Sequence, residues 1–177
     1  EHYNPIIRKI RNMEKPVVAA VNGVAAGAGA SIALCCDIVV ACESATFIQA
    51  FSKIGLIPDS AGTFFLPRLV GMQKAAALMM TAEPVSAKDA EAMGMIYKVF
   101  SDESFKEESW KLASKLAKMP TKGLGLTKRL LNASYSSNLE QQLDMEDKCQ
   151  TIAGNTADFK EGIEAFFEKR KPNFKGE

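Results

Sequence analysis

Two short apolar runs, separated by a glycine-rich segment, constrain the fold of this chain most. "KPVVAAV", residues 15–21, is rich in β-branched residues, and "DIVVA", residues 37–41, has the same character. Short runs that are apolar throughout are typical of buried strands. Between them, "NGVAAGAGA", residues 22–30, predicts a loop, and "GASIALCCD", residues 29–37, predicts a short buried helix. The first part of the chain is therefore expected to be an α/β structure.

Apolar spacing extends this prediction along the rest of the chain. The further predicted elements are a helix at 3–13, an extended segment at 45–50, helices at 73–82 and 86–94, and a strand at 95–100. Ser86 is expected to cap its helix, and Gly94 to end it. Beyond Phe100 the apolar spacing is helical only, across residues 102–170. We therefore predict an α/β region at 1–100 and an all-helical region at 101–177.

Composition excludes several classes of function. The chain has 22 basic and 21 acidic residues and a net charge of +1, so nothing attracts it as a whole to nucleic acid or to an anionic membrane. No apolar run reaches about eighteen residues, so we expect no membrane span. The cysteines have neither a metal-ligand spacing nor a disulfide pattern, and are expected to be reduced in the cytoplasm. They are Cys35, Cys36, Cys42 and Cys149. The chain opens with Glu1 in a helical pattern, and we expect that an N-terminal part is absent.

The glycine-rich segment is a candidate binding site. Gly27, Ala28 and Gly29 lack bulk and precede a predicted helix, whose first N–H groups have no partner within the helix. Such a helix start can hold an anion or a developing oxyanion. Tight packing of the loop against the sheet explains the same residues equally well, and both interpretations stay open. A dinucleotide-binding fingerprint is disfavoured, because the third glycine of that motif is missing.

Asp59 is a candidate catalytic acid or base. It lies in "GLIPDSAGTFFLPR", residues 55–68, among apolar residues that would raise the proton affinity of its carboxylate. It could equally be the N-cap of a helix near residues 60–66. A serine triad is disfavoured, because the one histidine of the chain is His2, near its end.

A basic cluster lies near the C-terminus, and it also has two interpretations. Such a cluster is usually a solvated helix end, but it could also meet a phosphate-bearing ligand. Its members are Lys169, Arg170, Lys171 and Lys175.

Longer segments resemble the enoyl-CoA hydratase/isomerase (crotonase) superfamily. They are "KPVVAAVNGVAAGAGASIALCCDIVVA", "FIQAFSKIGLIPDSAGTFFLPRLVG", "SAKDAEAMGMIYKVF" and "FFEKRKPNF". The resemblance covers essentially the whole chain. It implies the C-terminal part of a spiral of ββα units, followed by helices that form trimers. It also implies an acyl-CoA thioester as substrate, and an enolate stabilised by two backbone N–H groups.

The resemblance also implies roles for individual residues. One oxyanion-hole amide falls at Ala28, and the other would lie upstream of Glu1. The two glutamates of the hydratases would fall at Ser31 and Phe51, which are not acidic. Asp59 falls where several isomerases of the superfamily have a catalytic aspartate, and "FSKIGLIPDSAGTFFLPR" is most similar to the branch of bacterial epoxyphenylacetyl-CoA isomerases.

These matches predict an acyl-CoA isomerase in which Asp59 moves a proton between carbons. A hydratase-type lyase or a thioester hydrolase on the same scaffold, and a catalytically silent interaction module, are the alternatives. The expected pocket residues are Gly27, Gly29, Ser31, Phe51, Ile57, Pro58 and Phe64, with Phe47, Phe51 and Phe64 as candidates for an apolar wall.

The resemblance also implies what the protein binds. The helix that carries Phe166 and Lys169 is similar to a family segment near a neighbouring subunit's acyl-CoA, so these two residues are expected to contact CoA. No metal and no cofactor are expected, since coenzyme A enters as part of the substrate. The expected assembly is a homotrimer or a dimer of trimers in the cytoplasm, without nucleic-acid or membrane partners.

Overall fold

The computed structural model describes residues 3–177, so His2 lies outside the described residues. These residues form two compact units. One unit comprises residues 3–11 and Val17–Lys111, and the other comprises Asn12–Pro16 and Leu112–Glu177. The predicted domain boundary at residue 100 stays a prediction, because compactness does not test whether either part folds alone.

Strands of the first unit form two three-stranded sheets. They are β1 (Val18–Val21), β2 (Val24–Ala26), β3 (Ile38–Cys42), β4 (Thr46–Ile48), β5 (Val85–Ser86) and β6 (Lys98–Phe100). In one sheet the order is β1-β3-β6, all parallel, with Val18 opposite Ile38. In the other the order is β2-β4-β5, where β2 and β4 are parallel and β5 is antiparallel to β4.

This strand order is a spiral of ββα units, as predicted. β1 enters one sheet, β2 enters the other, and helix α2 (Ala28–Leu34) follows. β3 and β4 then add one strand to each sheet in the same way. The prediction that residues 22–30 form only a loop is wrong, because β2 lies within them. It is three residues long, and only pairing with β4 makes it a strand.

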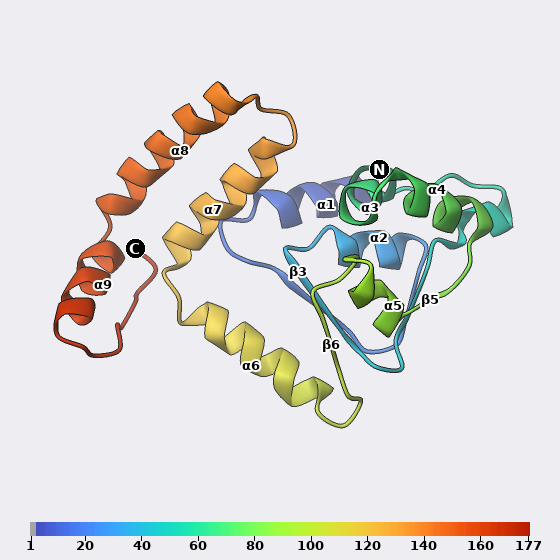
Figure 1. Cartoon of the computed structure of the whole chain (residues 1–177), viewed down its shortest axis with the longest axis horizontal. Coiled ribbons are helices and arrows are strands. Elements are labelled where there is room, and N and C mark those ends of the chain that lie inside the picture. The colour runs from blue at the N-terminus through green and yellow to red at the C-terminus, as the bar shows by residue number, and fades with distance from the viewer. Residues whose placement is uncertain (1–2) are drawn as a thin grey trace. The chain divides into compact units, whose positions relative to one another are not determined.

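Three further helices of the first unit agree with the predicted positions: α1 (Tyr3–Asn12), α4 (Met72–Thr81) and α5 (Ala87–Ala92). Helix α3 (Gly62–Val70) begins two residues later than the helix considered near 60–66, and a 3-10 helix at Ala50–Ile54 was not predicted. Helices α1 to α4 gather on one side of the strands (Figure 1). Both predicted ends of the 86–94 helix are confirmed: the Ser86 hydroxyl accepts from the Asp89 N–H at 3.1 Å, and Gly94 has φ 78°.

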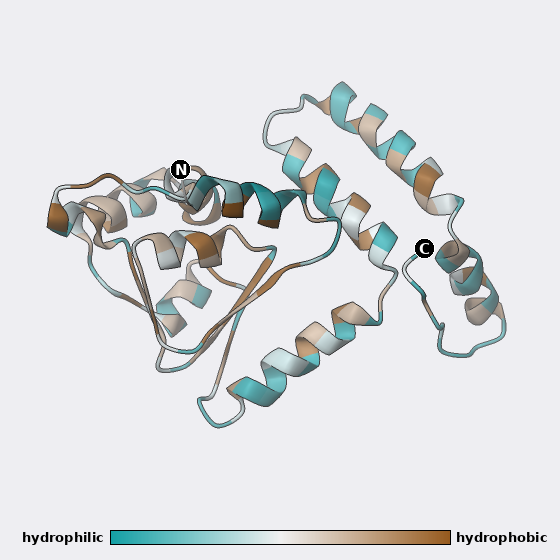
Figure 2. Cartoon of the chain, turned by 180° about the vertical axis from the view of Figure 1, so that it is seen from behind, coloured by the Kyte–Doolittle hydropathy of each residue, from teal (hydrophilic) through white to brown (hydrophobic). Residues whose placement is uncertain are grey.

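Helix α1 is attached to this unit by an apolar contact and an ion pair. Ile7 packs in a buried cluster with Cys35 and Phe65. One turn further along α1, Arg11 Nη1 lies 3.0 Å from Asp37 Oδ1. The other oxygen of this carboxylate, Asp37 Oδ2, accepts a hydrogen bond from the N–H of Val17, just before β1. Ile7 and Arg11 are one turn apart, so both contacts are made from the same side of α1, which carries both hydrophilic and hydrophobic residues (Figure 2).

The second unit is helical, as predicted. Its elements are the end of α6 (Phe105–Ala117), α7 (Thr121–Ser134), α8 (Leu139–Gly154) and α9 (Ala157–Phe167). Asn138 and Gln141 form a reciprocal capping box at the start of α8, and Thr156 caps α9. Hydrophilic and hydrophobic residues alternate along these helices, as expected when one side of each is packed (Figure 2). Across residues 3–177, no helix is long and apolar enough to cross a membrane.

Candidate functional site

The start of helix α2 is open, as an anion-binding or oxyanion site requires. Gly27 is its N-cap with φ 53°, a left-handed conformation that glycine adopts without strain. The Gly27 N–H donates to Ile48 O at 2.8 Å, which fixes the helix start against β4. A Cβ at Gly29 would meet no atom within 4 Å. The space beside Gly29 is therefore open, and the first N–H groups of α2, including that of Ala28, have no partner within the helix.

Ser31 connects this helix start to the segment around Asp59. Ser31 is fully buried and lies one turn after Ala28, on the same side of α2. A Cβ on Gly62 would lie 2.7 Å from Ser31 Oγ and 3.5 Å from Pro58 Cβ. The segment 58–62 therefore passes directly beside α2. Among the described atoms, Ser31 Oγ has no hydrogen-bond partner.

Asp59 does not cap a helix. Helix α3 begins at Gly62, and its N-cap is Ala61, which has no side-chain cap. The carbonyl of Asp59 accepts from the Gly62 N–H at 2.9 Å, whereas its carboxylate accepts from Ser60 Oγ at 3.0 Å. The prediction of an N-cap is therefore wrong, and the Asp59 carboxylate is not engaged in capping the helix.

Two left-handed residues separate Asp59 from α3, and sequence reasoning missed them. Ser60 has φ 52° and Ala61 has φ 61°. Each left-handed non-glycine residue costs about 1–2 kcal/mol, and such strain is found preferentially at functional sites. Neither residue type favours this conformation, so the sequence carries no signal for it. Because of this strained turn, α3 begins only at Gly62, and Asp59 lies in the preceding loop.

The predicted apolar residues are divided between the core and the surface. Phe47 and Phe51 are buried, and the Phe51 ring lies 3.7 Å from where a Cβ on Gly27 would be. Phe64 and Ile57 are exposed, Ile57 by 81%. Asp59 is exposed as well, so the expectation that flanking apolar residues enclose it is wrong for the described residues. Ile57 and Phe64 are apolar, but Ile57 projects outward from the loop and Phe64 projects outward from the start of α3.

Phe64 has a polar neighbour that the sequence did not indicate. The Arg68 guanidinium lies 3.8 Å from the centroid of the Phe64 ring, and the Phe65 ring packs edge-on at 5.1 Å. The two phenylalanines are consecutive, and only Phe65 enters the core.

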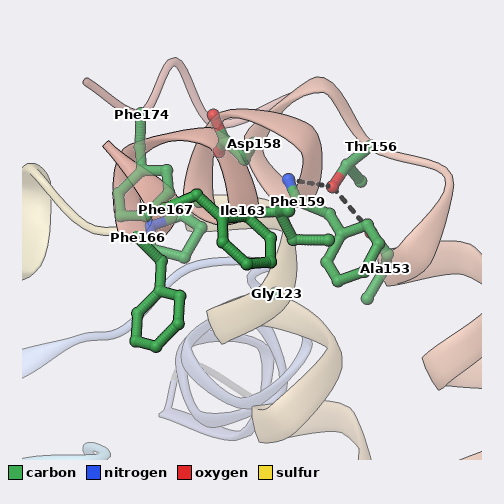
Figure 3. Close-up of a pocket in the computed structure, with 11 residues that line it drawn as sticks. Gly123, Ala153, Thr156, Asp158, Phe159, Ile163, Phe166, Phe167 and Phe174 are labelled. Atoms are coloured by element: carbon green, nitrogen blue, oxygen red, sulfur yellow. Dashed lines mark hydrogen bonds between the residues drawn. The ribbon is translucent and has the colours of Figure 1, made fainter. Parts of the chain in front are cut away.

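Phe166 and Lys169 belong to the second unit. Phe166 is 79% exposed and lines a groove of about 620 Å³ along α9. The side chains of Phe159, Ile163 and Phe166 lie along one side of this helix, and the Asp158 carboxylate lies on the other (Figure 3). Lys169 follows the end of α9 and has φ 55°.

The described residues hold no cluster of three histidine, cysteine or acidic side chains that could bind a metal. The four cysteines are free thiols in the structure. A hydrogen bond with Cys36, together with burial, raises the pKa of the Cys35 thiol, so this sulfur stays protonated.

Comparison with known proteins identifies the family. The model of the enoyl-CoA hydratase/isomerase family matches residues 1–177. The chain belongs to this family. It is 48% identical to the 1,2-epoxyphenylacetyl-CoA isomerase of Escherichia coli K12, over 98% of this chain and 66% of that protein. It is 45% identical to a probable enoyl-CoA hydratase of Rhodobacter capsulatus, over 99% of this chain and 68% of that protein.

Solved structures agree with this assignment. The structure of a putative enoyl-CoA hydratase/isomerase from Mycobacterium abscessus matches with a TM-score of 0.95 and 35% identity, over 99% of this chain and 68% of that one. The crotonase fold predicted from the sequence is therefore confirmed. The chain spans about two thirds of the length of the curated relatives that it matches.

Two neighbouring features of the first unit are relevant to the chemistry of the enoyl-CoA hydratase/isomerase family. The open start of α2 and the loop that carries Asp59 adjoin each other through Ser31 and Gly62. Backbone N–H groups at a helix start can stabilise an oxyanion, and a carboxylate can exchange a proton with carbon. Together they can support the chemistry of an enolate.

Proposed function

We propose that the complete protein is an acyl-CoA isomerase that moves a double bond through a thioester enolate, with Asp59 as the proton shuttle. Ring-opening isomerisation of an epoxyphenylacetyl-CoA uses the same enolate chemistry and is included in this proposal. A relative with 48% identity bears that name.

The observation that carries the proposal is the position of Asp59. Its carboxylate stands ahead of α3 without capping it, in the segment that packs beside the start of α2. The positions where hydratases would have their two glutamates hold Ser31 and Phe51, and both side chains are buried. A single carboxylate with no second one to activate water favours isomerisation over hydration.

The proposed steps balance in protons and electrons. Asp59 takes a proton from the carbon next to the thioester, and the electron pair of that C–H bond enters the enolate. The Ala28 N–H, at the start of α2, donates to the enolate oxygen. The electron pair of the original double bond then takes a proton from Asp59 at the γ-carbon, while the enolate pair forms the new double bond and the thioester carbonyl is restored. The double bond has moved from the 3 to the 2 position, and Asp59 is a carboxylate again.

Coenzyme A enters as part of the substrate, and the proposal requires no cofactor. Gly27, Gly29, Pro58, Ile57 and Phe64 are proposed to border the acyl group, with Ser31 and Phe51 behind them. Phe166 and Lys169 are proposed to contact the nucleotide end of CoA in a trimer or a dimer of trimers, in the cytoplasm. A trimer would bring copies of the second unit together.

Product analysis tests the proposal. The complete protein is offered a 3-enoyl-CoA and a 2-enoyl-CoA, and the products are separated by chromatography. The proposal predicts interconversion of the two enoyl esters without a 3-hydroxyacyl product. Formation of the 3-hydroxyacyl ester as the main product would identify a hydratase. Binding of both esters without any conversion would identify a silent module.

A further inference from the structure

The end of helix α9 is an unusual place for a lysine. The Arg170 N–H donates to Ala165 O at 3.0 Å, and the Lys169 N–H donates to Phe166 O at 3.3 Å. These two bonds form a Schellman motif, with Glu168 as C-cap and Lys169 in the left-handed position. Glycine is the usual residue at this position, because a side chain there is strained. A lysine at this position disfavours the fold, and its side chain is therefore a candidate for a functional role.

The two adjacent basic residues of this turn, Lys169 and Arg170, differ in their side-chain interactions. Arg170 makes a bidentate ion pair with Glu161, with Nη1–Oε1 at 2.6 Å and Nη2–Oε2 at 2.9 Å, and its Nε donates to Glu168. The Lys169 ammonium has neither an ion pair nor a hydrogen bond within residues 3–177. Arg170 holds the turn, and Lys169 is left available.

Glu161 also ties the turn to the chain that follows it. Its Oε1 accepts from the Asn173 N–H at 2.6 Å, in addition to its bonds with Arg170. Hydrogen bonds from Arg170 and then from Asn173 lower the pKa of Glu161 to about 2, so it stays charged at neutral pH. One carboxylate thus closes both sides of the turn that carries Lys169.

Asp158 fixes the rest of the tail, residues 171–177, along the same helix. It is buried, and its two carboxylate oxygens accept from the N–H groups of Lys175 at 2.6 Å and Gly176 at 2.8 Å. Phe174 rests against Gly162, with ring carbons 3.6 and 3.9 Å from where a Cβ would be. The tail is therefore attached at several points, and the turn cannot move independently of α9.

We infer that Glu161 and Arg170 are positioning residues, whose ion pair fixes the turn after α9 so that Lys169 and Phe166 are held ready for the nucleotide end of an acyl-CoA. The inference rests on the proposed function. The ammonium of Lys169 suits a phosphate, and the exposed ring of Phe166 suits an adenine face. A fixed turn loses little conformational freedom on binding, so affinity for the ligand increases.

Calorimetric titration of the complete protein with coenzyme A, and separately with pantetheine, tests this inference without requiring turnover. Pantetheine lacks the nucleotide. Glu161→Gln is expected to weaken coenzyme A binding about tenfold, the effect of one lost charge-assisted hydrogen bond, and to leave pantetheine binding unchanged. Glu164→Gln is the matched control, because Glu164 is on the same helix and its exposed side chain makes neither an ion pair nor a hydrogen bond within residues 3–177. It is expected to bind both ligands as the wild type does.

Lys169→Gly separates a functional role from a structural one. Glycine relieves the left-handed strain, so the melting temperature is expected to rise by about 2 °C while coenzyme A affinity falls about tenfold. Lower affinity in a more stable protein cannot come from unfolding.

Several outcomes would overturn the inference: no binding of coenzyme A by the wild type, equal loss for both ligands, or unchanged affinity in Glu161→Gln. Failure of the proposed function has a different signature. In that case the wild type converts no enoyl ester, yet the two variants still lose coenzyme A affinity as described.

Discussion

Gly62→Ala is expected to destabilise the protein through one atom of a neighbouring helix. The new Cβ would lie 2.7 Å from Ser31 Oγ, closer than such atoms approach, and Ser31 is fully buried. Overpacking of this kind costs about 1–3 kcal/mol, and alanine regains less than about 1 kcal/mol through helix propensity. We expect the free energy of unfolding to fall by about 1–2 kcal/mol, and the melting temperature by about 2–8 °C.

Ser31→Ala in the same background provides the control. The Ser31 Cβ lies 3.6 Å from the new Cβ, an ordinary contact, so only the hydroxyl clashes. The hydroxyl has no partner among the described atoms, so removing it alone is expected to be neutral or stabilising by about 1 kcal/mol. The double variant Ser31→Ala/Gly62→Ala should therefore regain the stability that Gly62→Ala loses.

Urea denaturation of the four proteins measures this cycle. The account predicts a coupling energy of about 1–2 kcal/mol between the two positions, in the direction of rescue. If Gly62→Ala were neutral, or if the coupling were below about 0.5 kcal/mol, α2 and α3 would not approach each other as described.

Further predictions concern the tail that returns along α9. Asp158→Ala should cost about 2–4 kcal/mol, because two charge-assisted hydrogen bonds that its buried carboxylate accepts from backbone N–H groups are lost, and hydrogen exchange should show faster amides at Lys175 and Gly176; unchanged exchange there would contradict the attachment. The folded-state pKa of Glu161 is about 2 against an ordinary 4.5, so its stabilisation is complete above about pH 4.5 and is lost as the pH falls toward about 2. Urea midpoints measured between about pH 5 and about pH 3 should therefore fall less steeply in Glu161→Gln than in the wild type, and equal slopes would refute this assignment.

The parts of the fold that were predictable are those with a local signal. The apolar runs at 15–21 and 37–41 predicted β1 and β3, because short runs that are apolar throughout are typical of strands. The expected burial is confirmed for β3 but is wrong for β1, where none of the four residues is buried and Ala20 is exposed. The strands β2 and β5 have only three and two residues, too few for a pattern that predicts a strand. Their conformation depends on pairing with β4, which is a tertiary interaction.

The site was predictable to a similar extent. Small residues before an apolar helix indicated the open start of α2, and that position of Ala28 agrees with the structure. The role of Asp59 as a cap was wrong, because Ser60 and Ala61 adopt a conformation that their side chains do not favour. The exposure of Asp59 depends on where the loop lies, and neighbouring residue types do not determine it. The part played by Glu161 depends on a chain reversal that brings the tail back along α9.

The central claim is that Asp59 carries a proton between carbons, and solvent deuterium exchange tests it most directly. The complete protein and its Asp59→Asn variant are incubated with a 3-enoyl-CoA in D₂O, and label at the α- and γ-carbons is followed by mass spectrometry and NMR. The account predicts exchange and isomerisation by the wild type, and a loss of both by at least about 100-fold in the variant, whose amide cannot accept the proton. Exchange by Asp59→Asn at a rate within a few-fold of the wild type would contradict the account.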